Sequence, residues 1–357
     1  MGAQWAGVPA LDDPGALCLA VETSCDETAA AVVRRTGAVV SSVVASQAQL
    51  HARYGGVVPE LAARHHLEAL LPTVDLALRQ AGVVWSDIGL VAVTRGPGLP
   101  AALLVGLAAA KAIAFARALP LVGVNHVAAH IHAHALDGGT LPRPSVCLVV
   151  SGSHTDLCLL PAAGGLELLG TTVDDAAGEA FDKVARLLGL GYPGGPAIDR
   201  AARQGRAGAV TLPRGRAPHG PRRPAPGVLG GRWAFSFSGL KTAVAVALAQ
   251  RTGIAPQDMA AAFQAAVVET LVARTLDAAQ AKGVGSVLLA GGVAANSALR
   301  AQMAAACAAA GLRLQVPPPQ YCTDNAAMVG AAGWALAAAG RSDGWDLDAD
   351  PNLPLAL

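Results

Sequence analysis

Short apolar runs separated by polar turns begin the patterned part of the chain. Residues 17–22 form one apolar run, and residues 29–33 form a second run after a polar turn. This arrangement is typical of a buried β-hairpin. The same pattern recurs at 146–150 and 157–160, on either side of another polar turn. Two hairpins of one design predict two duplicated lobes.

Longer segments with helical character alternate with further apolar runs. Gly and Pro mark the turns between these segments, and the segment from residue 291 to 296 leads into one more helix. Such alternation predicts an α/β fold. Helices are expected at 59–80, 99–119, 175–188 and 258–281, and buried strands at 90–94 and 286–289.

The chain of 357 residues is long enough for two lobes of ordinary domain size, each with its own core. We expect a flexible leader at 1–16, an N-terminal lobe at 17–142 and a C-terminal lobe at 143–324. Residues 325–357 can pack back on the first lobe.

The net charge is close to zero, with 26 basic and 25 acidic residues, so a nucleic-acid contact requires a local patch. One candidate is a Gly-, Pro- and Arg-rich loop at 203–232, within a segment from Arg200 to Lys241 that has no acidic residue. Its arginines predict contacts with a phosphate backbone, and the alternative is a solvated insertion. They are Arg203, Arg206, Arg214, Arg216, Arg222, Arg223 and Arg232.

A membrane span is not expected, because the longest apolar stretch, 101–120, contains Lys111 and Arg117. The first residues lack the pattern of a secretory signal, which makes the cytoplasm the expected location. The six cysteines lie far apart without CxxC spacing, so we interpret them as buried free thiols.

His126 and His130 are spaced so that a helix would place both imidazoles on one face, where they can share a metal. The alternative is a pair of surface or capping histidines. Asp324 is the candidate third ligand, although its place directly before an apolar helix favours a capping role. Two imidazoles and one carboxylate, contributed by the two lobes, would form an open site for iron or zinc.

Gly-rich turns at 151–155 and 291–292 can hold phosphates, because Gly permits close approach and successive amides form an anion nest. Tight turns use the same residues for geometry alone, which is the alternative. Carboxylates at 174–183 and 192–199 surround another Gly-rich turn and could bind ribose hydroxyls, or could serve as helix caps.

Seven motifs in order, from about residue 17 to about residue 339, resemble one family. It is the tRNA adenosine threonylcarbamoyltransferase family, once labelled O-sialoglycoprotein endopeptidase. The motifs are ETSCDET at 22–28, NHVAAH at 125–130, DDAAGEAFDK at 174–183, YPGGP at 192–196, FSFSGLKT at 235–242, GGVAAN at 291–296 and CTDN at 322–325.

The resemblance implies an actin-like fold, as in sugar kinases and heat-shock ATPases, with two duplicated lobes around a nucleotide cleft. It also implies that the N6 amine of adenosine-37 in tRNA attacks the carbonyl of threonylcarbamoyl-adenylate and releases AMP. The bacterial branch of the family would add a shorter paralogous subunit and a small ATPase as partners.

By position, the resemblance implies one divalent metal on His126, His130 and Asp324, with iron favoured and zinc as the alternative. It places Glu27 near the reacting centre as a catalytic residue. One departure is Ser153, which stands where the family pattern has a second Gly. The residues that would contact the adenylate are Val149, Val150, Ser151, Gly152, Ser153, Asp182, Gly195, Asp199 and Asn296.

Two other functions fit parts of the sequence. A metalloprotease would follow the older family label, but the chain lacks HExxH and no Glu adjoins His126. A non-catalytic ATP-binding scaffold of the same fold is the second, although a degenerate scaffold would have no reason to keep His126, His130 and Asp324.

Overall fold

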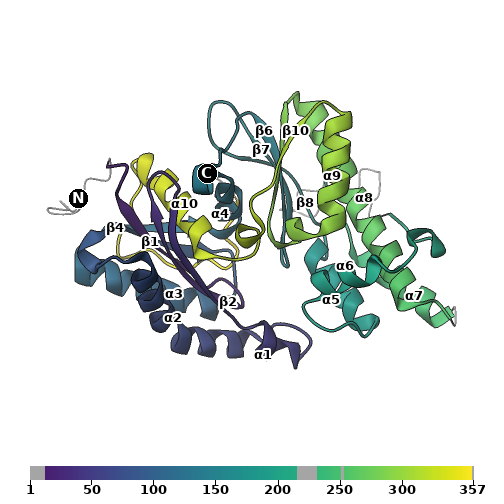
Figure 1. Ribbon diagram of the computed structural model, residues 1–357, viewed down its shortest axis with the longest axis horizontal. Coiled ribbons are helices and arrows are strands. Elements are labelled where there is room, and N and C mark those ends of the chain that lie inside the picture. The colour runs from purple at the N-terminus through teal and green to yellow at the C-terminus, as the bar shows by residue number, and fades with distance from the viewer. Residues whose placement is uncertain (1–12, 215–230, 251–252, 356–357) are drawn as a thin grey trace. The chain divides into compact units, whose positions relative to one another are not determined.

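The computed structural model describes residues 13–214, 231–250 and 253–355 (Figure 1). Within these residues the chain divides into a first unit, 13–141 with 324–355, and a second unit, 142–323. Asp324 therefore belongs to the first unit, one residue away from the predicted boundary, because the chain returns to that unit just before its last helix. Most of the predicted leader lies outside the described residues.

The first unit contains a mixed five-stranded sheet in the order β3-β2-β1-β4-β5. β1 pairs antiparallel with β2 and parallel with β4, and β4 pairs parallel with β5. All six residues of β1 are buried, so both faces of the sheet centre are covered. The strands are β1 Leu17–Glu22, β2 Glu27–Arg34, β3 Val39–Ser46, β4 Ile88–Gly96 and β5 Leu121–Asn125.

Alternating residues of β1 point to opposite faces of this sheet. Leu17, Leu19 and Val21 join a core with apolar side chains of α2 (Pro59–Ala81) and α3 (Pro100–Arg117). The other face packs against α10 (Ala326–Ala338), which comes from the far end of the chain. Two short helices complete this unit, α1 (Ala48–Ala52) and α4 (His126–His132).

Small residues allow α10 to approach the sheet closely. A Cβ atom at Gly330 would lie 2.8 Å from Val33 Cγ2, and one at Gly333 would lie 2.6 Å from Ala92 Cβ. Side chains larger than hydrogen at these two positions would push the helix away from the sheet. The Ala- and Gly-rich sequence of α10 thus determines where Asp324, just before the helix, is held.

The second unit repeats the strand arrangement of the first, with the order β8-β7-β6-β9-β10. β6 pairs antiparallel with β7 and parallel with β9, as β1 does with β2 and β4. The prediction of a duplicated α/β architecture is confirmed. The strands are β6 Ser145–Val150, β7 Thr155–Leu160, β8 Glu167–Thr171, β9 Ser286–Ala290 and β10 Arg313–Gln315.

The core of the second unit forms where helices cover this sheet. Phe181 and Phe263 meet edge to face with their ring centroids 5.2 Å apart, beside Leu148 and Val150 of β6. The helices are α5 Ala177–Leu187, α6 Gly194–Ala202, α7 Ser238–Gln250, α8 Pro256–Lys282 and α9 Ser297–Ala309. Short 3-10 helices lie at Trp85–Asp87, Ala133–Gly138, Ala207–Ala209, Gly292–Ala295 and Pro319–Tyr321.

Two helices in the described part of the chain, α3 and α8, are long and apolar enough to cross a membrane by length and composition alone. Of the apolar window in α8, 72% is buried inside the protein, as in the core helix of a soluble protein. The window in α3 is 33% buried, and its buried residues pack into the core of the first unit.

Candidate functional site

The carboxyl ends of the parallel strands in the first unit carry a group of buried polar residues. Glu22 ends β1, Thr94 lies near the end of β4, and His126 follows β5 directly. Parallel strands bring their carboxyl ends to the same edge of a sheet, which is where α/β folds bind ligands. This edge is the candidate site.

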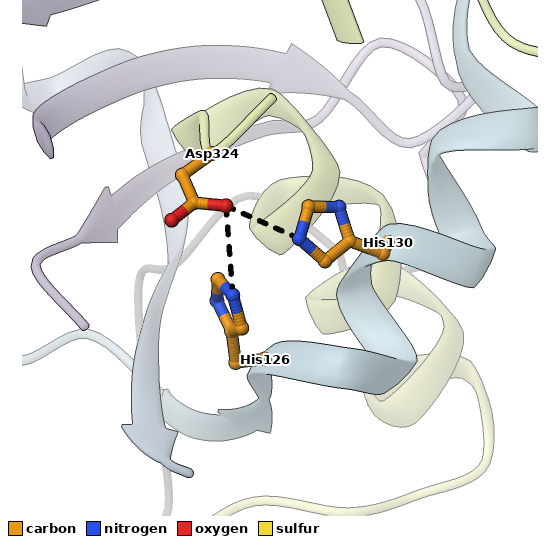
Figure 2. A group of neighbouring side chains, drawn as sticks. All are labelled: His126, His130 and Asp324. Carbon is orange, nitrogen blue, oxygen red and sulfur yellow. Dashed lines mark ion pairs between the residues drawn. The ribbon is translucent and has the colours of Figure 1, made fainter. Parts of the chain in front are cut away.

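α4 presents His126 and His130 from its first two turns. The cap of the helix is Asn125, whose side-chain oxygen accepts hydrogen bonds from the backbone N–H groups of Val127 and Ala128 at 2.9 and 3.0 Å. The two imidazoles meet edge to face, with ring centroids 4.8 Å apart (Figure 2). Since Asn125 serves as the cap, the histidines are not required for capping.

Asp324 likewise leaves the capping role to its neighbour. Asn325 caps α10 by accepting a hydrogen bond from Met328 N at 3.0 Å. Figure 2 shows the Asp324 carboxylate directed at both imidazoles. Its Oδ1 lies 3.6 Å from His126 Nε2 and 3.2 Å from His130 Nε2. All three residues belong to the first unit, so the prediction that the two lobes share the ligands is wrong.

These three side chains have the geometry of a metal site. One ligand atom from each lies within 4.8 Å of the others, and the two histidines are 5% and 1% exposed. Ligand atoms about 2.1 Å from a tetrahedral metal are separated by about 3.4 Å, close to the 3.6 and 3.2 Å between Asp324 Oδ1 and the two imidazole nitrogens. Neither ring nitrogen of His130 has a hydrogen-bond partner among the described residues. A metal ion would satisfy this buried imidazole.

Glu22 is the residue near this site whose role the sequence did not predict. Its carboxylate is completely buried and accepts hydrogen bonds from Thr94 Oγ1 at 2.6 Å and His126 Nδ1 at 3.0 Å. Burial acts to raise the pKa of Glu22, but the charge of His126 and the hydrogen bonds from His126 and Thr94 together outweigh burial and lower it. In return, although burial acts to lower the pKa of His126, Glu22 and Asp324 raise it to about 9.

Glu27, the predicted catalytic residue, begins β2. Its Oε1 accepts a hydrogen bond from Ser46 Oγ at 2.8 Å, whereas its buried Oε2 has no hydrogen-bond partner among the described residues. Burial raises the pKa of Glu27 to about 7, and the negative charges of Asp26 and Asp324 act in the same direction. A carboxylate that titrates near neutral pH can accept a proton at working pH.

The turn that leads to Glu27 is held by a buried histidine of α2. His66 is fully buried, with Nε2 2.9 Å from the carbonyl oxygen of Cys25 and Nδ1 2.7 Å from Thr28 Oγ1. Burial raises the pKa of the Cys25 thiol well above its usual value, and nearby acidic groups add to the shift. Cys25 therefore stays protonated, consistent with the absence of a catalytic role.

The second unit places both predicted phosphate-binding turns at the carboxyl edge of its sheet. Residues 151–153 follow β6 and Gly291 follows β9, and these strands are neighbours. Gly291 has a φ of +87°, and a Cβ atom there would collide with the carbonyl oxygen of Val150. Only glycine fits this close approach. A Cβ at Gly152, by contrast, would meet open space.

Comparisons with known proteins identify the family. The family model described as tRNA N6-adenosine threonylcarbamoyltransferase matches residues 38–331. The chain belongs to this family. A relative of that name from Symbiobacterium thermophilum is 54% identical over 345 residues, covering 96% of this chain and 97% of the relative. Another, from Thermomicrobium roseum, is 49% identical over 371 residues, covering 95% and 97%.

Solved structures show the same fold. HypF from T. kodakarensis has a TM-score of 0.59 at 15% identity, covering 93% of this chain and 49% of that one. Component A of (R)-2-hydroxyglutaryl-CoA dehydratase from Acidaminococcus fermentans has a TM-score of 0.54 at 13% identity, covering 90% and 99%. These likenesses confirm the predicted actin-like fold. The matching family model and both relatives are named as threonylcarbamoyltransferases, and these names give no support to the metalloprotease alternative.

Several residues that the family pattern assigns to the adenylate make contacts within the second unit. Asp182 of α5 accepts a hydrogen bond from Gly194 N at 2.7 Å and so fixes the start of α6. Asp199 of α6 accepts hydrogen bonds from Arg203 at 2.7 Å and from Ser297 Oγ at 2.8 Å. Asp182 thus links α5 to the start of α6, and Asp199 links α6 to the start of α9.

The remaining family positions differ in how they can reach a ligand. Val149 and Val150 have fully buried side chains in β6, so only their backbone can touch a substrate. Asn296 caps α9 through Leu299 N at 2.9 Å and donates to Gln264 Oε1 at 2.8 Å. A Cβ at Gly195 would meet open space. Asn296 is therefore the cap of α9, and its side-chain amide already has protein partners.

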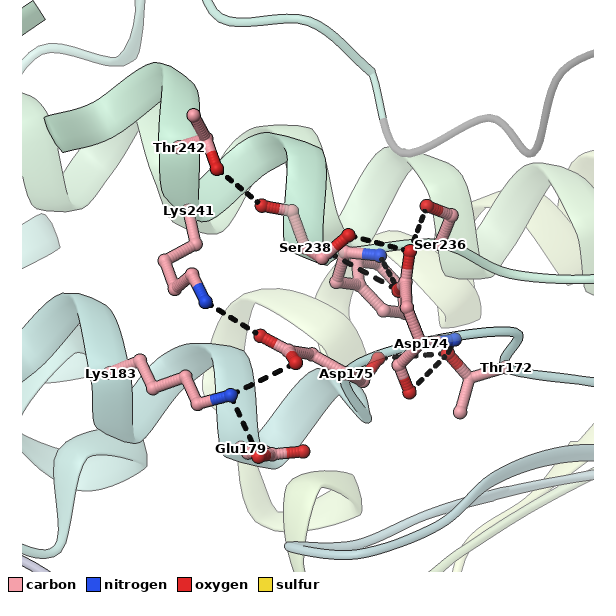
Figure 3. A network of polar contacts seen from close by, with 10 residues as sticks. Thr172, Asp174, Asp175, Glu179, Lys183, Ser236, Ser238, Lys241 and Thr242 are labelled. Carbon is pink, nitrogen blue, oxygen red and sulfur yellow. Dashed lines mark hydrogen bonds and ion pairs between the residues drawn. The ribbon is translucent and has the colours of Figure 1, made fainter. Parts of the chain in front are cut away.

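A polar network in the second unit joins the family motif at 174–183 to the family motif at 235–242 (Figure 3). Asp174 accepts hydrogen bonds from Ser236 Oγ at 2.5 Å and from Ser238 Oγ at 2.7 Å. Burial acts to raise the pKa of Asp174, but these hydrogen bonds outweigh it and lower it. Asp175 pairs with Lys183 Nζ at 2.9 Å. Asp174 thus holds the start of α7, and Asp175 adds an ion pair with Lys241 of that helix at 3.5 Å.

The described arginines of the predicted basic loop form ion pairs with acidic residues that lie outside the acid-free segment 200–241. The sequence around them lacks acids, but helices bring carboxylates within ion-pair distance. Arg216, Arg222 and Arg223 lie outside the described residues. The ion pairs are Arg203 with Asp199, Arg206 with Asp258, Arg214 with Glu269 and Arg232 with Asp277.

Ser153, the departure from the family pattern, is expected to be tolerated. Among described non-glycine residues only Ala118 and Asp137 have positive φ, so Ser153 does not need the conformational freedom of glycine. We expect Ser153→Gly to change adenylate affinity by less than about tenfold, or about 1.4 kcal/mol. Calorimetric titration with a non-reactive adenylate analogue measures this change.

The matched control is Gly291→Ala, which should weaken binding of the analogue because its Cβ collides with the Val150 carbonyl oxygen. More than tenfold tighter binding by Ser153→Gly would show instead that the serine obstructs the turn.

Proposed function

We propose that the chain transfers the threonylcarbamoyl group from threonylcarbamoyl-adenylate to the N6 amine of adenosine-37 in tRNAs that read ANN codons. AMP is the leaving group. The observation that carries the proposal is the convergence of His126 Nε2, His130 Nε2 and Asp324 Oδ1 in a buried site of a family member. Family membership supports the reaction, and the geometry supports the proposal of a metal at these three side chains.

One divalent metal ion would bind to these three side chains. Two histidines and one carboxylate favour iron(II), and zinc is the alternative. Such an ion would polarise the threonylcarbamoyl carbonyl or hold the phosphate of the departing AMP. Asn125 and Asn325 support the site by capping the helices, which keeps the three ligands directed at one point.

The transfer forms a bond between N6 and the carbonyl carbon and breaks the bond between that carbon and the adenylate phosphate oxygen. N6 loses one proton as the bond forms. We assign this proton to Glu27 Oε2, a buried oxygen without a hydrogen-bond partner among the described residues. The raised pKa of Glu27, about 7, makes it an effective base near neutral pH.

Binding of the adenylate is assigned to the second unit. The turn at 151–153 and Gly291 offer backbone amides to the phosphate, next to the buried strand end at Val149 and Val150. Asp182, Gly195, Asp199 and Asn296 complete the predicted set. Asp199 is the carboxylate proposed for a ribose hydroxyl, and it already accepts a hydrogen bond from the Ser297 hydroxyl.

The protein partners are proposed to be a shorter paralogous subunit and a small ATPase, acting with this chain in the cytoplasm. The first unit offers an apolar surface for a protein contact. Leu67 and Leu71, four residues apart on α2, are 67% and 63% exposed, and Leu104 on α3 is 52% exposed. Exposed apolar groups of this kind often mark interaction sites.

The proposed function is tested by incubating the metal-loaded protein with threonylcarbamoyl-adenylate and unmodified tRNA, with and without the two partners. The tRNA is then digested, and its nucleosides are separated and identified by mass spectrometry. Absence of the modified nucleoside in every mixture would overturn the proposal. Full activity without partners would leave transfer intact and remove the partner requirement.

The basic loop predicts a contact with the tRNA backbone. Replacing Arg214, Arg216, Arg222 and Arg223 together with serine should weaken tRNA binding. The slope of the logarithm of the binding constant against the logarithm of the salt concentration should become shallower by about 0.7–0.9 for each phosphate contact that is lost. Arg214→Ser alone should change little, because Glu269 neutralises Arg214 at 2.7 Å. Binding titrations at several salt concentrations measure both quantities, and Arg206→Ser serves as the paired-arginine control.

An unchanged affinity and salt slope in the fourfold variant would assign the loop to the alternative, a solvated insertion.

A further inference from the structure

We propose that Glu22 is a positioning residue that fixes the His126 imidazole in the one tautomer able to bind a metal. Metal affinity of the site then depends on a carboxylate that does not itself touch the metal. The inference rests on the proposed metal site at His126, His130 and Asp324.

Three hydrogen-bond donors converge on the two oxygens of Glu22. Oε1 accepts from the backbone N–H of Ser24 at 2.5 Å. Oε2 accepts from Thr94 Oγ1 at 2.6 Å and from His126 Nδ1 at 3.0 Å. The side chain is completely buried at the end of the central strand β1, so it has no freedom to turn away. An ionised carboxylate can only accept hydrogen bonds, which matches this set of donors.

His126 Nδ1 lies 3.0 Å from Glu22 Oε2 and 3.2 Å from Ser24 Oγ, and because an ionised carboxylate can only accept, the contact with Glu22 determines which nitrogen of His126 carries the proton. A neutral imidazole has one N–H, and with Nδ1–H donated to Glu22 the lone pair is on Nε2. Nε2 is the nitrogen that lies 3.6 Å from Asp324 Oδ1. Carboxylates that hold metal-binding histidines in this way raise ligand basicity and fix ring orientation.

His130 provides an internal comparison. Its Nδ1 is buried and has no hydrogen-bond partner among the described residues. The orientation of His130 therefore depends on packing, including the edge-to-face contact with His126. Of the two imidazoles, only His126 has a carboxylate that selects its tautomer, so disturbing Glu22 should act on the site through His126.

Glutamine at position 22 cannot satisfy the same three donors. If its oxygen faces Thr94 and His126, its NH₂ group faces the Ser24 N–H, and two buried donors oppose each other. If its NH₂ group faces His126, Nδ1 must become the acceptor and the proton moves to Nε2. The nitrogen directed at the metal is then blocked. The first arrangement keeps the proton on Nδ1 and costs stability through the opposed donors, whereas the second removes the lone pair that is directed at the metal and weakens metal binding.

The test is the affinity of the full-length protein for zinc and for iron(II) under anaerobic conditions. Glu22→Gln should weaken binding 10- to 100-fold, the range seen when carboxylates behind metal-binding histidines are replaced. The matched control is Glu27→Gln, which removes one nearby negative charge without touching a ligand and should leave metal affinity within about threefold. Thermal melting confirms that each variant is folded.

A second measurement reads the tautomer directly. In the zinc-loaded wild-type protein, nitrogen NMR should show a slowly exchanging proton on His126 Nδ1 and none on Nε2. Equal metal affinity of Glu22→Gln and wild type, or a wild-type Nδ1 without a proton, would overturn the inference. Failure of the wild-type protein to bind either metal would instead overturn the proposed metal site.

Discussion

Replacing His126, His130 or Asp324 with alanine is expected to abolish metal binding and threonylcarbamoyl transfer together. Each residue supplies one of three converging ligand atoms, and two protein ligands hold a divalent ion weakly. We expect the transfer rate to fall at least about 100-fold in each variant, together with the metal content. Elemental analysis and mass spectrometry of digested tRNA give the two quantities.

His132→Ala is the matched control for these variants. It lies on the same helix, but its Nδ1 is 2.9 Å from the carbonyl oxygen of Ala128 and it is not one of the converging ligands. It should keep both metal and transfer. Three folded ligand variants with normal transfer would remove the metal from the mechanism. Peptide cleavage that disappears together with the metal would revive the protease alternative.

Glu27→Gln is expected to slow transfer about 10²- to 10⁴-fold at neutral pH while leaving metal content unchanged, as expected for loss of a general base. The pKa of Glu27 is raised to about 7, so the carboxylate is protonated below and ionised above that pH. Transfer by the wild-type protein should therefore rise with pH through this region. A metal at Asp324 would cancel one of the negative charges that raise this pKa and move the rise to lower pH.

Single-turnover rates between about pH 5 and pH 9 measure this dependence. The Glu27→Gln profile should be flat over the same range, and Ser46→Ala should shift the midpoint upward, because the Ser46 hydroxyl lowers the pKa of Glu27. A Glu27→Gln rate near that of wild type would exclude Glu27 as the base.

The sequence predicted those parts of the fold in which apolar residues form continuous buried runs. β1, β6 and β9 are buried almost throughout, and their apolar residues were visible as short runs. All four edge strands were missed: β3 and β8 contain exposed and polar positions that interrupt the pattern, and β5 and β10, with five and three residues, are too short to show one. Neighbouring strands stabilise them through backbone hydrogen bonds, which leave little trace in side-chain hydrophobicity.

For the site, the sequence could indicate residue types but not their partners. It favoured a capping role for Asp324, but its neighbour Asn325 can cap equally well, and in the structure Asn325 is the cap. It gave no sign that Glu22 meets His126, which lies 104 positions away. It also gave no sign that Arg214, which lies in a segment without acidic residues, pairs with Glu269 of a distant helix.

The discontinuous first unit has a consequence for synthesis on the ribosome. α4 is made early, but Asp324 and α10 are made only after the whole second unit. At about 5–20 residues per second, the interval from His130 to Asp324 lasts on the order of 10–40 s. During that time the face of the first sheet that includes Ala20 and Ala92 lacks its covering helix. The growing chain thus exposes the apolar face of this sheet until α10 is made, and the three proposed metal ligands can meet only once Asp324 has been synthesised.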